Sequence, residues 1–293
     1  MESRRADIRG PGGRRIEAHL AGPEDGRAVI FHTGTPDAGM VYRTMVEDGA
    51  ERGLRHVTYC RPGYGDSDRD EGRRVADCAA DVAAVADALG LERFHTVGAS
   101  GGGPHALASA ALLGERVISA ATMAGVAPHD AEGLDWLEGM GQKNHDEFGA
   151  AFAGTEPLRN YLDLEVEGMR GISGAEVREA FGDLLSEVDR AVLSGEFAEH
   201  VAEGCRAAIA SGIWGWFDDD MAFIDRWGFD PGAIEVPVTI WQGAEDRFVP
   251  FAHGQWLAEN VSGARARLPA DEGHLSIVLR RYGDVLDDLL AAI

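Results

Sequence analysis

The chain has 293 residues and a mass of 31.3 kDa, a length that suits one or two domains. It contains 27 basic and 50 acidic residues, which gives a formal net charge of −23. Nucleic acids and anionic membranes require a basic protein surface, so we expect neither as a partner. A small-molecule substrate is the expected partner. The oligomeric state is left open, with a homodimer as one alternative.

The three cysteines are odd in number and far apart, which indicates neither a disulfide framework nor a metal site: Cys60, Cys78 and Cys205. We therefore expect a reducing, cytoplasmic setting and no metal or cofactor. The N-terminal residues lack the apolar core of a secretory signal. No run of about 20 apolar residues is present that would span a bilayer.

Short apolar runs bounded by Gly or Pro predict the strands of a sheet. Two candidates at 5–9 and 14–20 flank a Gly-Pro-Gly-Gly turn. Six more have the pattern of strands buried on both faces: Ala28–His32, His56–Cys60, Arg93–Gly98, Val117–Met123, Val236–Trp241 and Ala264–Leu268. Helical patterns alternate with them, for example from Val75 to Leu89. We predict an α/β fold with a doubly wound, mostly parallel, eight-stranded sheet.

The alternation breaks between residues 128 and 232, where the pattern is helical. This stretch holds 12 of the 22 aromatic residues of the chain. We predict a core domain of residues 1–127 and 233–293 and a helical lid, or cap, of residues 128–232. Trp136, Trp214 and Phe217 are the expected pocket residues of the lid. Asp218–Asp220 could bind a substrate amine, although a solvated helix cap is the simpler interpretation.

The strongest functional motif is Gly98-Ala99-Ser100-Gly101-Gly102, between a predicted strand and a predicted helix. In such a nucleophile elbow, the serine has a strained backbone that holds its hydroxyl above the sheet. Small residues are needed around it because strand and helix pack closely. A glycine-rich structural turn is the alternative. A dinucleotide-binding loop is disfavoured because the spacing Gly-x-Gly-x-x-Gly is not met.

A serine nucleophile needs a base, and the base needs an orienting acid. In folds with this elbow, the order along the chain is Ser, then Asp or Glu, then His. His274 follows the last predicted strand, and Asp246 follows the strand before it. We predict that Ser100, Asp246 and His274 form a catalytic triad. Glu245 and Asp130 are the competing acids.

An oxyanion hole requires two backbone N–H donors. We expect the amide of Gly101, directly after the nucleophile, to be one of them. The second is expected from the loop Thr33-Gly34-Thr35-Pro36, which follows an early predicted strand. Within that loop, the amide of Thr35 is the candidate donor.

Together these motifs resemble those of the α/β-hydrolase superfamily. The matching segments are Thr33-Gly34-Thr35-Pro36, Arg61-Pro62-Gly63-Tyr64-Gly65-Asp66-Ser67, the serine motif, the Asp246 loop and Gly273-His274. The resemblance implies a serine hydrolase, in which Ser100 attacks a carbonyl carbon and His274 takes the hydroxyl proton. Two departures stand out. Thr33 occupies a position that is usually His in the family, and Gly101 occupies one where many relatives have a larger residue.

We expect hydrolysis of a small, largely apolar ester or thioester through an acyl-enzyme intermediate. An aminopeptidase or amidase is an alternative, since an acidic lid could hold an ammonium group. The same triad could also serve a lyase, a haloperoxidase or a C–C hydrolase. A non-catalytic ligand-binding protein is the least favoured, because all three members of the triad are present.

Overall fold

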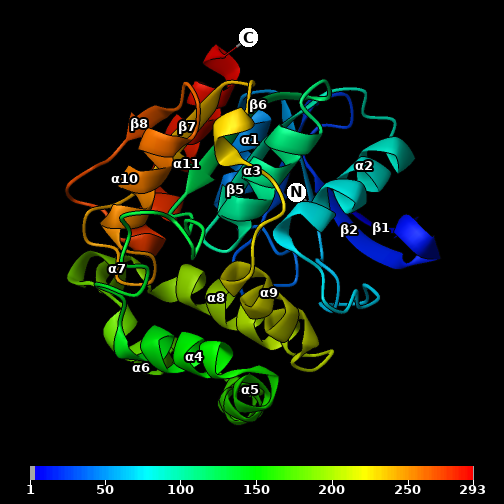
Figure 1. Ribbon diagram of the computed structural model, residues 1–293. Coiled ribbons are helices and arrows are strands. Elements are labelled where there is room, and N and C mark those ends of the chain that lie inside the picture. The colour runs from blue at the N-terminus through cyan, green and yellow to red at the C-terminus, as the bar shows by residue number, and fades with distance from the viewer. Residues whose placement is uncertain (1–3, 293) are drawn as a thin grey trace.

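The computed structural model describes residues 4–292, and over that range the strands form one eight-stranded sheet (Figure 1). The strands are β1 (Arg4–Arg9), β2 (Arg15–Ala21), β3 (Arg27–His32), β4 (Leu54–Tyr59), β5 (Phe94–Ala99), β6 (Val117–Met123), β7 (Val238–Trp241) and β8 (Arg265–Arg267). Their order is β1-β2-β4-β3-β5-β6-β7-β8. β2 pairs antiparallel with β1 and β4, and the remaining pairs are parallel. The predicted fold class is confirmed.

Five helices cover the two faces of the sheet. α1 (Arg43–Glu51) and α11 (His274–Ala291) pack on one face, and α2 (Cys78–Ala88), α3 (Gly102–Leu112) and α10 (Phe251–Asn260) pack on the other. Successive residues of β3 alternate between the two layers. Val29 and Phe31 pack in the core beneath α11, and Ala28 and Ile30 pack in the core beneath α3. This two-sided burial explains why the strand runs are continuously apolar.

Six helices lie between β6 and β7, and the described residues of this stretch form no strand. They are α4 (Gln142–Ala153), α5 (Thr155–Met169), α6 (Val177–Phe181), α7 (Glu187–Val192), α8 (Gly195–Ala208) and α9 (Trp214–Ile224). Figure 1 shows them gathered at one end of the sheet. They fall within 128–232, the range predicted for the lid, which we call the helical insertion. Short 3-10 helices span Pro11–Gly13, Val75–Asp77, Gly182–Leu184 and Pro231–Ala233.

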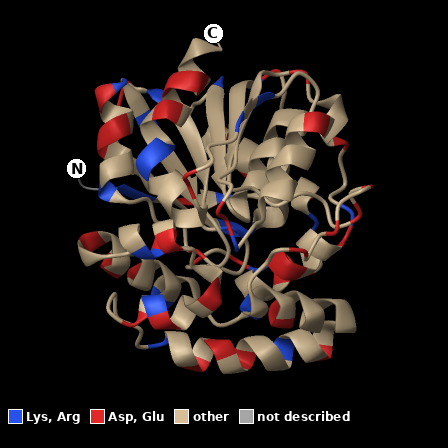
Figure 2. Ribbon diagram, turned by 90° about the vertical axis from the view of Figure 1, so that its left-hand side faces the viewer, with Lys and Arg blue, Asp and Glu red and all other residues tan. Residues whose placement is uncertain are grey.

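Charge is distributed unevenly between the surface and the interior. Figure 2 shows acidic residues spread over the helices of the insertion and over those that flank the sheet. Two arginines are buried instead, with exposed fractions of 2% for Arg61 and 7% for Arg73. Buried charges require partners, and these lie at the functional site described below. No helix of residues 4–292 has the length and apolar character needed to cross a membrane.

Candidate active site

Ser100 occupies the sharp turn between β5 and α3. Its φ angle is +53°, a left-handed conformation that non-glycine residues rarely adopt. The turn requires glycine on both sides of the serine. A Cβ atom at Gly98 would lie 2.1 Å from the carbonyl oxygen of Gly102, and one at Gly102 would lie 2.0 Å from the carbonyl oxygen of His32. The close approach of strand and helix therefore explains the small residues of the motif.

His274 and Asp246 are in direct contact. The imidazole Nδ1 of His274, the first residue of α11, lies 2.8 Å from Asp246 Oδ2. The other carboxylate oxygen, Oδ1, accepts hydrogen bonds from the amides of Phe248 and Val249 at 2.9 and 2.8 Å. Gln242 Nε2 also donates to Oδ2. The carboxylate is thus held from several sides, and it orients the imidazole with Nε2 left for other contacts.

The environment of this pair sets its protonation. Burial opposes protonation of His274, but the Asp246 carboxylate outweighs this effect, so the pKa of His274 lies above its ordinary value. Burial raises the pKa of Asp246, and the imidazole opposes that rise. The Phe248 ring stacks on the imidazole, with 4.5 Å between ring centroids. The competing acids Glu245 and Asp130 are exposed.

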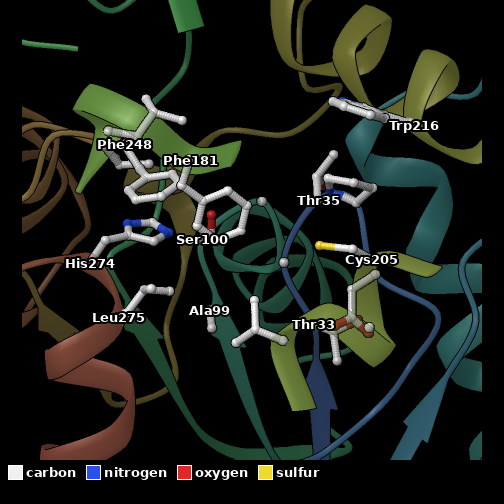
Figure 3. Close-up of a pocket in the computed structure, with 18 of the residues that line it drawn as sticks. Thr33, Thr35, Ala99, Ser100, Phe181, Cys205, Trp216, Phe248, His274 and Leu275 are labelled. Carbon is white, nitrogen blue, oxygen red and sulfur yellow. The ribbon is translucent and has the colours of Figure 1, made fainter. Parts of the chain in front are cut away.

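Ser100 and His274 line the same cavity, which has a volume of about 270 Å³. Figure 3 shows the His274 ring turned towards Ser100, with Phe181 and Phe248 beside it. Among residues 4–292, no hydrogen bond joins Ser100 Oγ to the imidazole. The structure therefore brings Asp246 and His274 into contact and places Ser100 on the same cavity as His274. Contacts between nucleophile and base commonly tighten when substrate binds.

The loop that carries Thr35 lies against the nucleophile turn. A Cβ atom at Gly34 would be 3.4 Å from Ser100 Cβ, and one at Gly101 would be 2.4 Å from Thr35 Oγ1. The Thr35 side chain thus fills the space that a side chain at position 101 would need. Within the described chain, the amides of Gly101 and Thr35 donate no hydrogen bond to a protein group. Both N–H groups are therefore available to a substrate oxygen.

Arg61 holds this loop from the side opposite the cavity. Its Nη1 donates to the carbonyl oxygen of Thr33 at 2.6 Å, and its Nη2 donates to that of Gly34 at 2.7 Å. The C=O and N–H of a planar trans peptide point in opposite directions. The bond from Arg61 to the Gly34 carbonyl therefore directs the Thr35 N–H away from the guanidinium. Thr35 lines the cavity and Arg61 does not.

Asp219 of α9 connects this loop to the insertion. Its carboxylate is fully buried and accepts hydrogen bonds from Thr35 Oγ1 at 2.7 Å, from Arg61 and Arg73 at 2.6 Å each, and from the Tyr64 hydroxyl at 3.0 Å. Burial opposes ionisation of Asp219, but the two guanidinium groups outweigh it and hold the pKa of this carboxyl well below its ordinary value. A buried carboxylate of the insertion, that of Asp219, thus holds the Thr35 loop of the core in place.

The expectation that Asp218–Asp220 form a solvated helix cap is wrong. Their exposed fractions are 3%, 0% and 0%. Asp218 pairs with Arg69 at 2.7 Å, Asp219 pairs with the buried arginines, and Asp220 lines the cavity. The arginines that balance Asp218 and Asp219 come from residues 61–73, far away in the chain. The sequence around Asp218–Asp220 alone does not show that arginines from a distant segment pair with these acids.

A second carboxylate of the insertion, Asp189 in α7, caps the helix that begins with His274. Asp189 Oδ2 accepts from the His274 amide at 3.0 Å, and Oδ1 accepts from the amides of Leu275 and Ser276 at 2.8 and 2.9 Å. The first amides of a helix have no partner inside it. Because Asp189 is fully buried, these bonds fix the start of α11 firmly. Sequence analysis missed this residue.

One face of α9 lines the cavity. Trp216, Asp220 and Phe223 follow one another at a spacing of about one helical turn on that face. Trp214 and Phe217 lie on another face, where the Trp214 ring packs 4.0 Å from the Arg69 guanidinium carbon.

The predicted pocket residues therefore need correction. Trp136 packs against Phe148, and its indole N–H donates to the carbonyl of Ala127. Like Trp214 and Phe217, Trp136 is absent from the cavity lining, which includes Trp216 instead. The positions of aromatic residues along the chain do not show which helix face is turned inwards. In Figure 3, Trp216 lies on the side of the cavity away from His274.

One group of described residues offers ligand atoms for a metal ion within 4.8 Å of one another: Glu17, His19 and Cys60. This group lies outside the cavity that contains Ser100. Arg5 forms an ion pair with Glu17 at 3.2 Å, and the Cys60 thiol donates to the carbonyl of Ala38. Burial raises the pKa of Cys60. The contacts present here thus compete with a metal ion for the same atoms.

Comparison with known proteins shows the family to which the chain belongs. A family model described as the alpha/beta hydrolase fold matches residues 27–166. The chain is 30% identical over 278 residues to a non-heme chloroperoxidase of Streptomyces lividans, covering 93% of both chains. It is 26% identical to a 2-hydroxy-6-oxononadienedioate/2-hydroxy-6-oxononatrienedioate hydrolase of Klebsiella pneumoniae, covering 90% of this chain and 86% of the relative.

Solved structures match over the whole fold. A bromoperoxidase from Bacillus anthracis has a TM-score of 0.71 at 21% identity, with 98% of this chain and 100% of the other covered. An esterase from a Rhodococcus species has a TM-score of 0.73 at 18% identity, with 99% of each chain covered. At these identities the likeness concerns the fold.

Proposed function

Because this chain belongs to the α/β-hydrolase superfamily and is an enzyme of hydrolase type, we propose that it cleaves a small ester or thioester through an acyl-enzyme at Ser100. The observation that carries the proposal is the hydrogen bond between Asp246 and His274, formed at the wall of the cavity that contains Ser100. The strained turn of Ser100, which exposes the serine side chain to that cavity, supports the same assignment.

In the proposed mechanism, Ser100 Oγ attacks the carbonyl carbon while His274 Nε2 takes the hydroxyl proton. Asp246 holds the imidazole and stabilises its charged form. The amides of Gly101 and Thr35 stabilise the tetrahedral oxyanion. His274 then gives its proton to the leaving alcohol or thiol. A water molecule, deprotonated by His274, releases the acid and restores the Ser100 hydroxyl.

The cavity supports a small substrate beneath the helical insertion, to which we assign the role of a lid. A volume of about 270 Å³ lies just below the range of drug-sized pockets. The walls of the cavity are mostly apolar and come from both parts of the chain. They include Met45, Val126, Met140, Phe148, Phe181 and Phe248. A short acyl chain suits this space.

The charged groups of the cavity weigh against a dicarboxylate such as the one in the name of the Klebsiella relative. Lys143 is the only lysine or arginine in the lining, and it is paired with Glu165 at 2.9 Å. Asp37, Glu147 and Asp220 line the same cavity. A cavity with this excess of acidic groups repels anionic substrates.

A fluorophosphonate probe tests the proposal, since it phosphonylates an activated serine. We expect it to label the wild-type chain and to leave Ser100→Ala unlabelled. Hydrolysis of p-nitrophenyl butyrate should fall at least about 10³-fold in that variant. Ser262→Ala changes an exposed serine and should behave as wild type in both assays. Equal labelling of the wild type and of Ser100→Ala would refute the nucleophile.

A further inference from the structure

Asp220 stands out among the buried groups of the molecule. Its side chain is fully buried, it lines the cavity, and no N–H group of the described residues donates to either carboxyl oxygen. Buried polar atoms without a partner are costly and uncommon in folded proteins. The catalytic steps proposed above make no use of this residue. One proton shared with Glu147 can serve only one of its oxygens, so a ligand in the cavity is the remaining source of donors for the other.

A second carboxyl group, that of Glu147 on α4, faces Asp220. Burial raises the pKa of Asp220 well above its ordinary value, and the neighbouring Glu147 charge adds to this. Burial raises the pKa of Glu147 to about 7. Among described residues, the only N–H donor to Glu147 is Trp216 Nε1, at 2.8 Å, and the Glu147 carboxyl also forms a hydrogen bond with that of Asp220. Two acids so close together share one proton near neutral pH and carry a single negative charge.

Other charged and titratable groups face this pair from every neighbouring element. Lys143 of α4 and Glu165 of α5 form an ion pair, and the Tyr161 hydroxyl lies beside them. On the opposite side, Asp219 is paired with Arg61 and Arg73. Together, Arg61, Arg73 and Asp219 carry one net positive charge. The single negative charge of the Asp220–Glu147 pair balances it. The buried group is therefore neutral when the pair holds its proton.

We infer that Asp220 and Glu147 form a subsite for a primary ammonium group carried by the substrate. An ammonium supplies three N–H donors, and the pair offers carboxyl oxygens that lack them. A bound cation favours the ionised form of both acids, so the shared proton leaves when the ammonium binds. Lys143 already places an ammonium group against a carboxylate at this end of the cavity.

The position of the subsite relative to the nucleophile defines the substrate further. A Cβ atom at Gly101 would lie 3.0 Å from Phe223 Cζ, so Phe223 marks the nucleophile end of α9. Asp220 is three residues earlier in the helix, about 4.5 Å along its axis. The substrate class is therefore a short ester or thioester with an amine a few atoms from the scissile carbonyl. This statement about the substrate depends on the proposed function, whereas ammonium binding does not.

Calorimetry with simple ligands tests the subsite without any turnover. We would titrate the wild-type chain with n-pentylammonium, 1-pentanol and pentanoate. Pentylammonium should bind at least about tenfold more tightly than pentanol, and pentanoate should bind more weakly than both. Titrations in two buffers of different ionisation enthalpy should give release of about one proton per ammonium bound. Affinity for pentylammonium should rise with pH, because the carboxyl pair must lose its shared proton when the ammonium binds.

Three variants locate the effect. Asp220→Asn and Glu147→Gln should each weaken pentylammonium binding at least about tenfold, abolish proton release and leave pentanol binding unchanged. Glu167→Gln removes the same charge from an exposed position on α5 and should bind as wild type. If Asp220→Asn does not fold, the subsite is tested by Glu147→Gln and by the relative affinities of the wild-type chain for the three ligands.

Two results would overturn the subsite: equal affinity for pentanol and pentylammonium, or wild-type ammonium binding and proton release in the folded variants. Refutation of the proposed function would be seen in a different experiment, as fluorophosphonate labelling that does not depend on Ser100. The two failures are therefore distinguishable.

Discussion

Gly101→Ala places one methyl group at the most crowded point of the proposed oxyanion hole. The added Cβ would lie 2.4 Å from Thr35 Oγ1 and 2.9 Å from Thr35 Cβ, where ordinary contacts begin at 3.4 Å. One side of this contact must therefore move by about 1 Å. Thr35 does not yield easily, because its hydroxyl donates to Asp219 at 2.7 Å and accepts from Arg61 at 2.9 Å.

The two ways of relieving the clash have different magnitudes. If Thr35 moves, it loses two hydrogen bonds to charged groups, each worth about 1.5–3 kcal/mol. If the Gly101 backbone moves instead, its amide shifts by about 1 Å, and such a misplacement costs roughly 10²-fold in rate. Overpacking in a core typically costs about 1–3 kcal/mol, so the second route is the cheaper one. We expect a folded variant with kcat lowered about 10²-fold and a modest fall in Tm.

The assay combines p-nitrophenyl butyrate hydrolysis with thermal unfolding. Gly149→Ala is the matched control, since Gly149 lies in α4 with nothing within 4 Å of an added Cβ. Its Tm should rise slightly, because Ala favours a helix more than Gly does. Thr35→Ala removes the 2.4 Å contact, so Gly101→Ala should cost less stability in a Thr35→Ala background than in the wild type. Wild-type kcat and Tm in Gly101→Ala would refute the argument from crowding.

Three further predictions concern the charged groups around the site. Asp189→Asn removes the carboxylate that caps α11 and should lower stability by about 1–3 kcal/mol in urea unfolding, with kcat falling more than KM rises. Asp219→Asn leaves Arg61 and Arg73 without their buried counter-charge and should cost about 3–5 kcal/mol by the same measurement. Activity needs neutral His274, whose pKa is raised, so kcat/KM should rise with pH through a midpoint above 6.5. In Asp246→Asn that midpoint should fall, and kcat should drop by roughly 10⁴-fold; an unchanged midpoint would contradict the role given to Asp246.

The inner strands of the sheet were predictable because they are short apolar runs bounded by glycine, proline and turn residues. The prediction Val117–Met123 matches β6, and Ala28–His32 differs from β3 by one residue. The close pairing of His274 with Asp246 was also expected, because the carboxyl ends of neighbouring parallel strands lie at one edge of the sheet. β6, β7 and β8 are such neighbours.

The contacts between the insertion and the core could not be predicted in the same way. Asp219 is 158 residues from Arg61, and Asp189 is 85 residues from the His274 amide. No local period connects such positions, and isolated acidic residues are common in a chain of net charge −23. The prediction that Trp214 lines the pocket failed for a related reason, since Trp216 lines it instead. Residues two apart on a helix point in different directions, and only the packed structure shows which one faces the cavity.

The two carboxylates that the insertion sends into the core have an evolutionary consequence. Asp189 holds the start of the histidine helix, and Asp219 holds the threonine loop beside the serine. Replacing residues 128–232 with the corresponding segment of a relative would therefore remove two supports of the catalytic framework as well as the substrate-facing wall. Exchange of specificity by recombination requires a donor segment with acids at both places. Single substitutions within the existing helices keep Asp189 and Asp219 in place, so they can change specificity without this requirement.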